Sequence, residues 1–283
     1  MSISDLPEEL LLKIFKYMKP QNLLETAQVS KTWSRVSRDD TLWQKIILTW
    51  KTLTEIENLD LHITRLIRMC PAVAVFKLDE VIAAIINPNK VIRDLIENCD
   101  NLEHLVLEGQ VGIGLDTLEL ITGRWSLSLQ TLSIGIRSLE KGVPNLGMYR
   151  KLKKLHFRIE FSTDQQKMYM PWAGREQEGL YMAAILDIPG LEELILEGFM
   201  WGFQTLSKGV RNGKLKKLKC LALRSLLVVD TENVFTIVES LKNLKYFEID
   251  DSFDIEGEVK DVVAALQMEH PFTKFTSLPH LQL

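Results

Sequence analysis

Residues 152–157 read LKKLHF, and residues 191–196 read LEELIL. Both stretches follow the pattern L-x-x-L-x-L, in which x is any residue and the other positions are apolar. Successive side chains of a β-strand point to opposite faces, so the last two apolar positions share one face and the residues beside them share the other. Each stretch therefore predicts a short strand with one buried side and one polar side.

The same pattern recurs along most of the chain. The other strong copies are LEHLVL at 102–107, LQTLSI at 129–134, LKCLAL at 218–223 and LKYFEI at 244–249. Weaker copies are Val73/Phe76/Leu78 and, at the end of the sequence, Leu278/Leu281/Leu283. Most steps between the starts of neighbouring copies lie between 23 and 29 residues. Self-similarity at this period is typical of leucine-rich repeats.

Helix-like apolar spacing fills the segments between the predicted strands. It covers Glu80–Asn98, Thr117–Arg124, Glu178–Leu186, Thr231–Leu241 and Glu256–Met268. One strand and one helix cannot bury an apolar face alone, whereas stacked repeats share a continuous core. We therefore predict an α/β solenoid of about seven to eight irregular repeats over residues 73–283. Its parallel strands are expected on the concave face and its helices on the convex face.

The first 48 residues have a different texture. A first helix is predicted because its apolar residues share one face: Leu6, Leu10, Ile14, Phe15 and Met18. Pro20 ends this helix, a second short helix is expected to include residues 23–33, and a third to cover Ser37–Ile46. Three such helices enclose a small core, so the apolar face of the first one is expected to need a partner chain.

These residues closely resemble an F-box, in order and without gaps over residues 4–48. The family pattern is roughly LPxExLxxIFxYLxxxxLxxxxxVCxxWxxxxxDxxLW, and this chain departs from it at Met18 and Ser30, where Leu and Cys are usual. The matching positions are Leu6-Pro7, Glu9-Leu10, Ile14-Phe15, Leu23-Leu24, Val29-Ser30, Trp33 and Leu42-Trp43. The predicted domains are an F-box at 1–48, a linker helix at 49–72 and leucine-rich repeats at 73–283.

The resemblance implies a docking module, because F-boxes bind the Skp adaptor of cullin–RING ubiquitin ligases. The implied adaptor contacts are Leu6, Pro7, Leu10, Ile14, Phe15, Leu23, Leu24, Val29, Trp33 and Trp43. Some of these residues are expected to fill the internal core instead. An F-box joined to leucine-rich repeats resembles a substrate receptor, which binds target proteins for ubiquitination and proteasomal degradation. The absence of a disulfide framework, together with acids where a signal peptide has basic residues, leads us to expect the cytoplasm or nucleus. The alternative is an interaction scaffold that delivers no substrate.

Composition and motifs argue against several other classes of function. With 34 Lys and Arg against 38 Asp and Glu, the net charge of −4 argues against a dedicated nucleic-acid or anionic-membrane binder, although a local basic patch is not excluded. The three cysteines form no CxxC pair, which argues against structural zinc and a disulfide framework. No apolar run approaches the roughly 20 residues of a membrane span.

The sequence contains no GxSxG, GxxxxGK[ST], GxGxxG or HExxH motif, and its 5 histidines show no metal-ligand spacing. We therefore expect a receptor without catalysis, metal or cofactor, which acts by holding a target near the transferring enzyme. Its expected partners are the adaptor with its cullin–RING ligase and a protein substrate, without nucleic acid or membrane.

One predicted strand carries basic residues at all of its outward positions. These are Lys154, His156 and Arg158, and the next strand offers Glu193 and Glu197. Two interpretations remain open. The charges either pair across the strands as a solvated face, which we favour, or dock an acidic or phosphorylated segment of a target.

An insertion after Arg158 adjoins the same repeat. It contains Met168, Tyr169 and Trp172, which are expected either to bind a protein substrate or to pack on their own repeat. A second aromatic stretch, Phe199–Phe203, is predicted to begin a convex helix instead.

Overall fold

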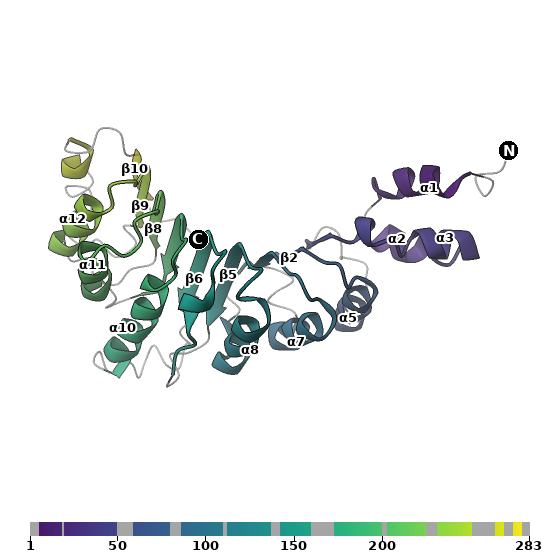
Figure 1. Cartoon of the computed structure of the whole chain (residues 1–283), viewed down its shortest axis with the longest axis horizontal. Coiled ribbons are helices and arrows are strands. Elements are labelled where there is room, and N and C mark those ends of the chain that lie inside the picture. Colours follow the sequence, from purple (N-terminus) through teal and green to yellow (C-terminus); the bar gives the residue numbers. More distant parts are fainter. Residues whose placement is uncertain are drawn as a thin grey trace. The chain divides into compact units, whose positions relative to one another are not determined.

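The computed structural model describes residues 6–18, 20–49, 59–79, 86–109, 112–136, 142–159, 173–199, 203–224, 231–250, 264–268 and 274–278. The chain forms two compact units, Met1–Gly109 (unit 1) and Gln110–Leu283 (unit 2). Both units contain helices and parallel strands (Figure 1).

Unit 1 begins with three short helices, α1 (Glu8–Phe15), α2 (Pro20–Thr26) and α3 (Lys31–Val36). Ser30 has an extended backbone, and its hydroxyl accepts a hydrogen bond from the Trp33 amide at 3.1 Å, as an N-cap does. This cap starts α3, so the single helix predicted across residues 23–33 is two helices. A 3₁₀ turn, η2 (Asp40–Leu42), follows α3.

The predicted helix over Ser37–Ile46 is wrong. Residues 45–48 form the strand β1 (Lys45–Leu48), which runs parallel to β2 (Val75–Leu78) with Lys45 opposite Val75. Ile46 and Leu48 are buried and Lys45 is exposed, which is the alternation of a strand. In this register Trp43 corresponds to Val73, so WQKIIL at 43–48 is a copy of the repeat motif with tryptophan in its first position.

The repeats therefore begin inside the segment that the sequence assigned to the F-box. Helix α5 (Leu59–Met69), in the expected linker, packs against α7 (Pro88–Asn98) as the helix of the first repeat. The strand β3 (His104–Leu107) then pairs in parallel with β2. The Gln44 carbonyl accepts the amides of Ala74 and Val75, and the Ala74 carbonyl accepts those of Glu103 and His104, so the same backbone connection recurs at each repeat.

Unit 2 continues this construction. Its strands are β4 (Gly112–Ile113), β5 (Thr131–Ile136), β6 (Lys154–Ile159), β7 (Glu193–Glu197), β8 (Cys220–Arg224), β9 (Tyr246–Asp250) and β10 (Lys274–Leu278). From β5 to β10 each strand pairs in parallel with the next, and β4 pairs with β5. The connections contain α8 (Leu115–Trp125), η3 (Leu146–Met148), α10 (Ala173–Leu186), α11 (Phe203–Arg211) and α12 (Thr231–Ser240).

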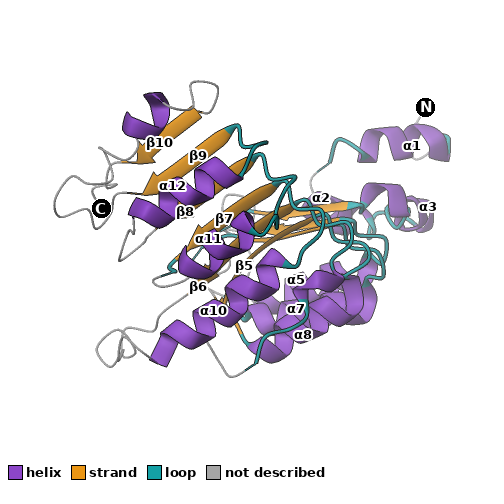
Figure 2. Ribbon diagram, turned by 60° about the vertical axis from the view of Figure 1, so that its left-hand side comes forward, coloured by secondary structure: helices purple, strands orange, loops and turns teal. Residues whose placement is uncertain are grey.

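The helices of unit 2 cover one face of its sheet (Figure 2). The apolar residues of the motif lie between these two layers: Leu155, Leu194, Leu221 and Phe247 are aligned across β6 to β9 and are at most 2% exposed. The Phe157 ring packs against Tyr181 and Phe199, with centroids 5.7 and 6.3 Å apart. The predicted solenoid architecture, with parallel strands and helices segregated on one face, is confirmed.

The last predicted strand is displaced. Strand β10 ends at Leu278, where the copy Leu278/Leu281/Leu283 would begin, and Leu281 and Leu283 lie outside the described residues. Phe275 is opposite Phe247 and Ser277 is opposite Ile249. In this register the last copy reads FTKFTS at 272–277, in which serine replaces the final apolar residue.

Candidate functional site

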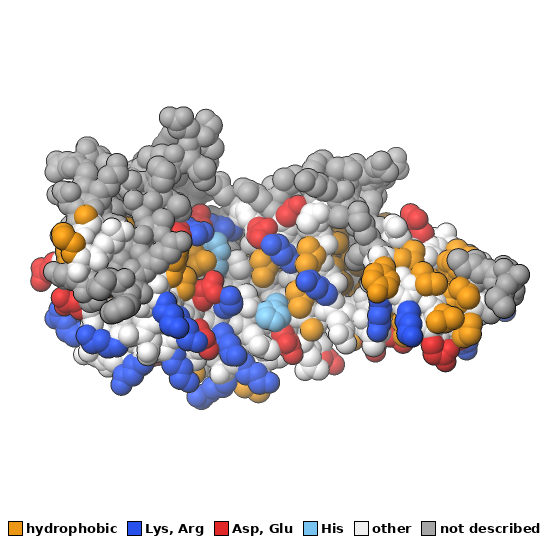
Figure 3. Space-filling model, turned by 90° about the horizontal axis from the view of Figure 1, so that it is seen from above, with side chains coloured by type: hydrophobic (Ala, Val, Ile, Leu, Met, Phe, Trp, Pro, Cys, Tyr) orange, Lys and Arg blue, Asp and Glu red, His pale blue; other side chains and the backbone are white. Residues whose placement is uncertain are grey.

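The predicted adaptor contacts on the first three helices of unit 1 differ in their exposure. Pro7 is exposed, and the exposed fractions of Leu10, Ile14 and Val29 are 44%, 43% and 60%. Leu6 and Trp33 are partly buried. Figure 3 shows hydrophobic side chains gathered over the part of unit 1 that holds these helices. These positions remain available to a partner.

Leu10 and Ile14 are one helical turn apart on α1, and Tyr17, 92% exposed, lies in the turn that follows the helix, where its amide donates to the Ile14 carbonyl at 3.0 Å. Residues spaced by three and four along a helix lie on one face, so we call these three residues the α1 stripe. The stripe has fixed support, because α1 packs against α3 and an ion pair joins Glu8 to Arg35. It is an apolar surface on a short helix that packs against α3.

Three other predicted contacts lie in the interior. Phe15, Leu23 and Trp43 are at most 2% exposed. The Phe15 ring meets Trp33 edge to face at 5.3 Å, and the Trp43 indole N–H donates to the Ser37 carbonyl at 2.6 Å. These three residues fill the internal core, as was expected for some of the predicted contacts, because helices this short are held together by their side chains. The Leu24 side chain lies outside the described residues.

The outward residues of unit 2 form columns on the sheet face opposite its helices, which we call the open face. The register gives their order: Thr131, Lys154, Glu193, Cys220 and Tyr246 in the first column, Ser133, His156, Ile195, Ala222 and Glu248 in the second, Gly135, Arg158, Glu197 and Arg224 in the third. Neighbours within a column are about 4.8 Å apart. Polar groups on neighbouring strands therefore lie within reach of one another.

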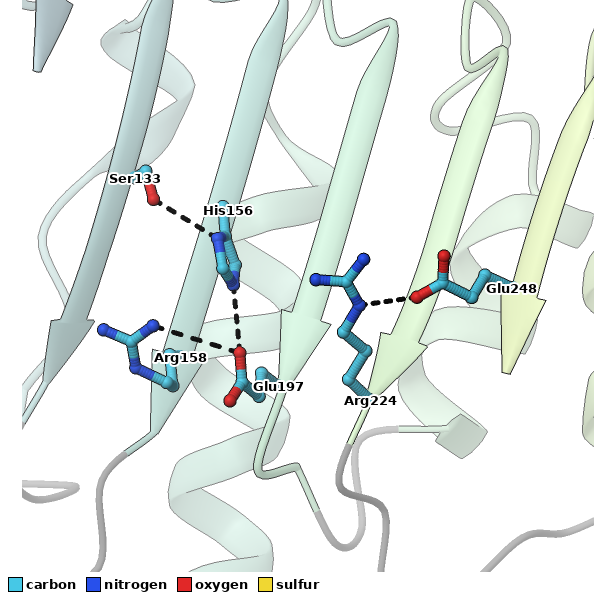
Figure 4. A network of polar contacts seen from close by, with 6 residues as sticks. All are labelled: Ser133, His156, Arg158, Glu197, Arg224 and Glu248. Atoms are coloured by element: carbon cyan, nitrogen blue, oxygen red, sulfur yellow. Dashed lines mark hydrogen bonds and ion pairs between the residues drawn. The ribbon is translucent and has the colours of Figure 1, made fainter. Parts of the chain in front are cut away.

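The three basic residues of β6 are all paired. The Lys154 ammonium lies 2.6 Å from the Glu193 carboxylate. The two ring nitrogens of His156 lie 3.2 Å from the Ser133 hydroxyl and 3.1 Å from the Glu197 carboxylate (Figure 4). The Arg158 guanidinium approaches the same carboxylate at 3.9 Å, with its side chain 9% exposed. Of the two interpretations of these charges, the structure supports pairing across strands.

The pairing changes the acidity of Glu197. Burial alone would raise the pKa of this carboxyl, but the hydrogen bond with His156 and the charges of Arg158 and Arg224 outweigh it and lower the pKa. Glu197 is therefore ionised at neutral pH and holds its partners in place. The hydrogen bond and charge of Glu193 likewise raise the pKa of Lys154.

A second polar set begins on the next strand, β8, where Arg224 lies opposite Glu197. The Arg224 Nε–H donates to the Glu248 carboxylate at 2.5 Å, and the Tyr246 hydroxyl donates to its other oxygen at 2.6 Å. Glu248 is 4% exposed, and these two donors lower its pKa although its burial acts in the opposite direction. The sequence analysis did not identify Arg224, Tyr246 and Glu248 as a set. Opposite charges in adjacent columns were the available signal.

The remaining predicted contacts differ in outcome. Met168, Tyr169 and Trp172 lie outside the described residues, and α10 begins directly after them at Ala173. Of the second aromatic stretch, Phe199 is 1% exposed, and Phe203 is 6% exposed and begins α11, as expected, whereas residues 200–202 lie outside the described residues.

Neither metal chemistry nor thiol chemistry is indicated in the described part of the chain. Within it, no group of three or more His, Cys, Asp or Glu side chains could hold a metal ion, and no helix is both long and apolar enough to span a bilayer. Cys70 and Cys99 are buried, and burial raises the pKa of the Cys70 thiol. Burial and the Glu193 charge raise the pKa of Cys220 to about 11, so that its thiol is protonated at neutral pH.

Comparison with known proteins places one family on the first part of the chain. Residues 3–49 match the F-box-like family. F-box/LRR-repeat protein 5 of Danio rerio is 47% identical over 45 residues, which are 16% of this chain and 7% of the relative. The protein of the same name from Xenopus tropicalis is 40% identical over 45 residues, with the same coverage. The protein from Mus musculus is 41% identical over 44 residues, which are 16% of this chain and 6% of the relative.

The matched segment is thus less than a tenth of the length of these relatives. It covers α1, α2, α3, η2 and the strand β1.

Proposed function

Because residues 3–49 form an F-box-like domain, we propose that this protein is the substrate-recognition subunit of an SCF (Skp–cullin–F-box) ubiquitin ligase. The observation that carries the proposal is the α1 stripe. Leu10, Ile14 and Tyr17 stay exposed, although Phe15 of the same helix is buried against Trp33. An apolar surface on a folded support is what a partner chain covers. In this proposal the Skp adaptor covers it and links the protein to the cullin.

The open face of unit 2 is the proposed binding surface for the target protein. It offers side chains that are already oriented, because Glu197 and Glu248 each hold neighbouring groups through hydrogen bonds. Oriented groups lose little conformational freedom when a ligand binds. The pairing of Lys154, His156 and Arg158 with acids makes this face mixed in charge, which favours a target segment carrying both signs over a purely acidic one.

The protein itself carries out no bond chemistry in this proposal. It holds the target near the enzyme that transfers ubiquitin, in the cytoplasm or nucleus, and proximity supplies the rate. The alternative is a scaffold that binds partners and does not deliver them for degradation.

The first test of this function is co-purification from cells. We expect the full chain to retain the Skp adaptor and the cullin, and we expect some bound proteins to accumulate only when the proteasome is inhibited. Loss of the chain should raise the amounts of the same proteins. A chain that retains no adaptor contradicts the proposal, and bound partners whose amounts do not change with proteasome inhibition support the scaffold.

The second test concerns the open face. We expect Lys154→Ala combined with His156→Ala to lower target capture severalfold and to leave adaptor binding unchanged, because both side chains reach the surface of unit 2. The matched control is Arg65→Ala with Lys90→Ala, on the helices of unit 1. Target capture is measured by quantifying the proteins that accumulate under proteasome inhibition. Equal capture by both double variants would place the binding surface elsewhere, and Trp172→Ala then tests the insertion.

A further inference from the structure

The edge of the unit 2 sheet at which its strands begin is built from one repeated position. The amide of Lys153 donates to the Gln130 carbonyl at 2.9 Å, and Glu192, Lys219 and Lys245 each donate to the equivalent carbonyl of the preceding repeat at 2.8 Å. These residues form a row with one position per strand, about 4.8 Å apart. The backbone therefore fixes where the side chains of this edge stand.

The edge is strongly basic. Its exposed cations, which we call the basic edge, are Arg150, Lys151, Lys153, Lys214, Lys216, Lys217, Lys219, Lys242 and Lys245. Figure 3 shows Lys and Arg side chains gathered along the lower rim, in the left half of the view. Two acidic residues lie among them, and each is paired with a lysine: Asp187 with Lys214 at 2.8 Å, and Glu192 with Lys219 at 2.5 Å.

The other cations keep their charge unbalanced. In the described part of the chain, none of Arg150, Lys151, Lys216, Lys217 and Lys242 has an ion-pair partner. The local field is visible at Glu192, whose pKa is lowered by its hydrogen bond and ion pair with Lys219 and further by the charges of Lys153 and Lys217. Charges act within a Debye length of about 8 Å at physiological salt, so the net −4 of the whole chain does not cancel this edge.

A strained turn holds the middle of the basic edge. Leu215 has a φ of 55°, in the left-handed region, and its side chain is 6% exposed. The Lys214 amide donates to the Gly209 carbonyl at 3.0 Å, and the Leu218 amide donates to Leu215 at 2.9 Å. With Leu215 anchored in the core, the neighbouring lysines are exposed on a short segment whose backbone is fixed.

Exposed apolar side chains adjoin the cations. Leu127 is 68% exposed and stands two residues before the first leucine of its repeat, the position that Arg150, Lys216 and Lys242 occupy in theirs. Met148, 45% exposed, precedes Arg150 by two residues. Tyr149 between them is buried, so no aromatic ring of this segment is available to stack on a nucleic-acid base. Cations beside apolar side chains match an anionic lipid surface, which takes up both.

We propose that the basic edge of unit 2 docks on the surface of an anionic lipid bilayer, with Leu127 and Met148 entering the interface between the headgroups. The contact is peripheral and reversible, and it uses no residue of the α1 stripe or of the columns that form the open face. It goes beyond the proposed function, because it would direct a receptor of this kind to targets at a membrane. It also replaces the sequence-based expectation that membranes are not among the partners.

Co-sedimentation of the full chain with vesicles tests the proposal. We expect binding to vesicles of phosphatidylcholine mixed with phosphatidylserine, no binding to phosphatidylcholine alone, and release at high salt. Lys216→Glu with Lys217→Glu should lower the partition coefficient about tenfold or more. Leu127→Ser with Met148→Ser should lower it at constant salt. All four side chains are exposed, so circular dichroism should show an unchanged fold.

The matched control is Arg65→Glu with Lys90→Glu, which changes the net charge equally on exposed helix positions of unit 1. It should bind the vesicles as the unchanged chain does. Equal losses in the two charge-reversal variants would show a response to net charge alone and would overturn the proposal. Binding to double-stranded DNA without binding to the anionic vesicles would overturn it as well, in favour of a nucleic-acid partner.

Discussion

Leu10→Asp combined with Ile14→Asp is expected to remove the Skp adaptor from the purified chain while the box stays folded. The two side chains are 44% and 43% exposed, so the folded chain tolerates a polar replacement. In the complex they would be buried, at about 1.5–3 kcal/mol each, and the new carboxylates would lose their hydration. The combined loss of roughly 3–6 kcal/mol is more than a hundredfold in affinity. Pull-down and calorimetry with the purified adaptor measure it.

Two comparison variants make this result specific. Leu120→Asp with Leu180→Asp changes side chains of matched exposure, 44% and 49%, on α8 and α10, and should keep the adaptor. Phe15→Ala should also lose the adaptor, but by loosening the box, since emptying a buried phenylalanine site costs about 3–5 kcal/mol. Thermal unfolding separates the two causes. Adaptor binding that survives Leu10→Asp with Ile14→Asp would remove the α1 stripe from the proposed interface.

The repeats were predictable wherever their apolar positions carry leucine, isoleucine or phenylalanine. Two copies were missed because another residue type stands at one position: Trp43 begins WQKIIL, and Ser277 ends FTKFTS. Trp43 was also taken as an F-box residue, and both assignments hold. Its indole N–H bonds to Ser37 in the box, while its place in the register makes it the first residue of the first repeat. Because Trp43 belongs to both motifs, its match to the F-box concealed the first copy of the repeat.

Part of the candidate site was also predictable, because strand period and register decide which residues share a face. Strand period and parallel register bring Lys154, His156 and Arg158 to the same face as Glu193 and Glu197. The sequence predicts this arrangement correctly. Whether such charges pair or stay open depends on side-chain reach. The 2.6 Å contact of Lys154 with Glu193 is a detail of rotamers that no sequence pattern contains. Exposure on α1 is similar: the helix pattern groups Ile14 with Phe15, yet only packing shows that Phe15 is the interior one.

Glu197→Gln is expected to destabilise unit 2 by about 2 kcal/mol. The amide keeps the size of the side chain but removes the charge that faces Arg158, whose side chain is 9% exposed and cannot recover full hydration. Breaking a fully buried pair costs about 3–5 kcal/mol, and the 25% exposure of Glu197 with its 3.9 Å distance to Arg158 lowers that figure. Glu193→Gln is the matched control. Its partner Lys154 is 58% exposed, so its loss should stay below about 1 kcal/mol in urea unfolding.

The same carboxylate predicts how the difference depends on pH. The folded-state pKa of Glu197 lies below its ordinary value of 4.5, so the ionised form binds its partners more strongly than water does. Its contribution to stability is therefore complete above the unfolded-state pKa and is lost as the pH falls through the folded-state pKa. Glu248 has a lowered pKa too, and because it is present in both chains it adds a loss of stability to each of them in the same range of pH. We expect the unchanged chain to lose more stability than Glu197→Gln between about pH 6 and pH 3, so that the two unfolding curves converge in acid. A gap that stays constant across this range would show that Glu197 acts through its shape and not through its charge.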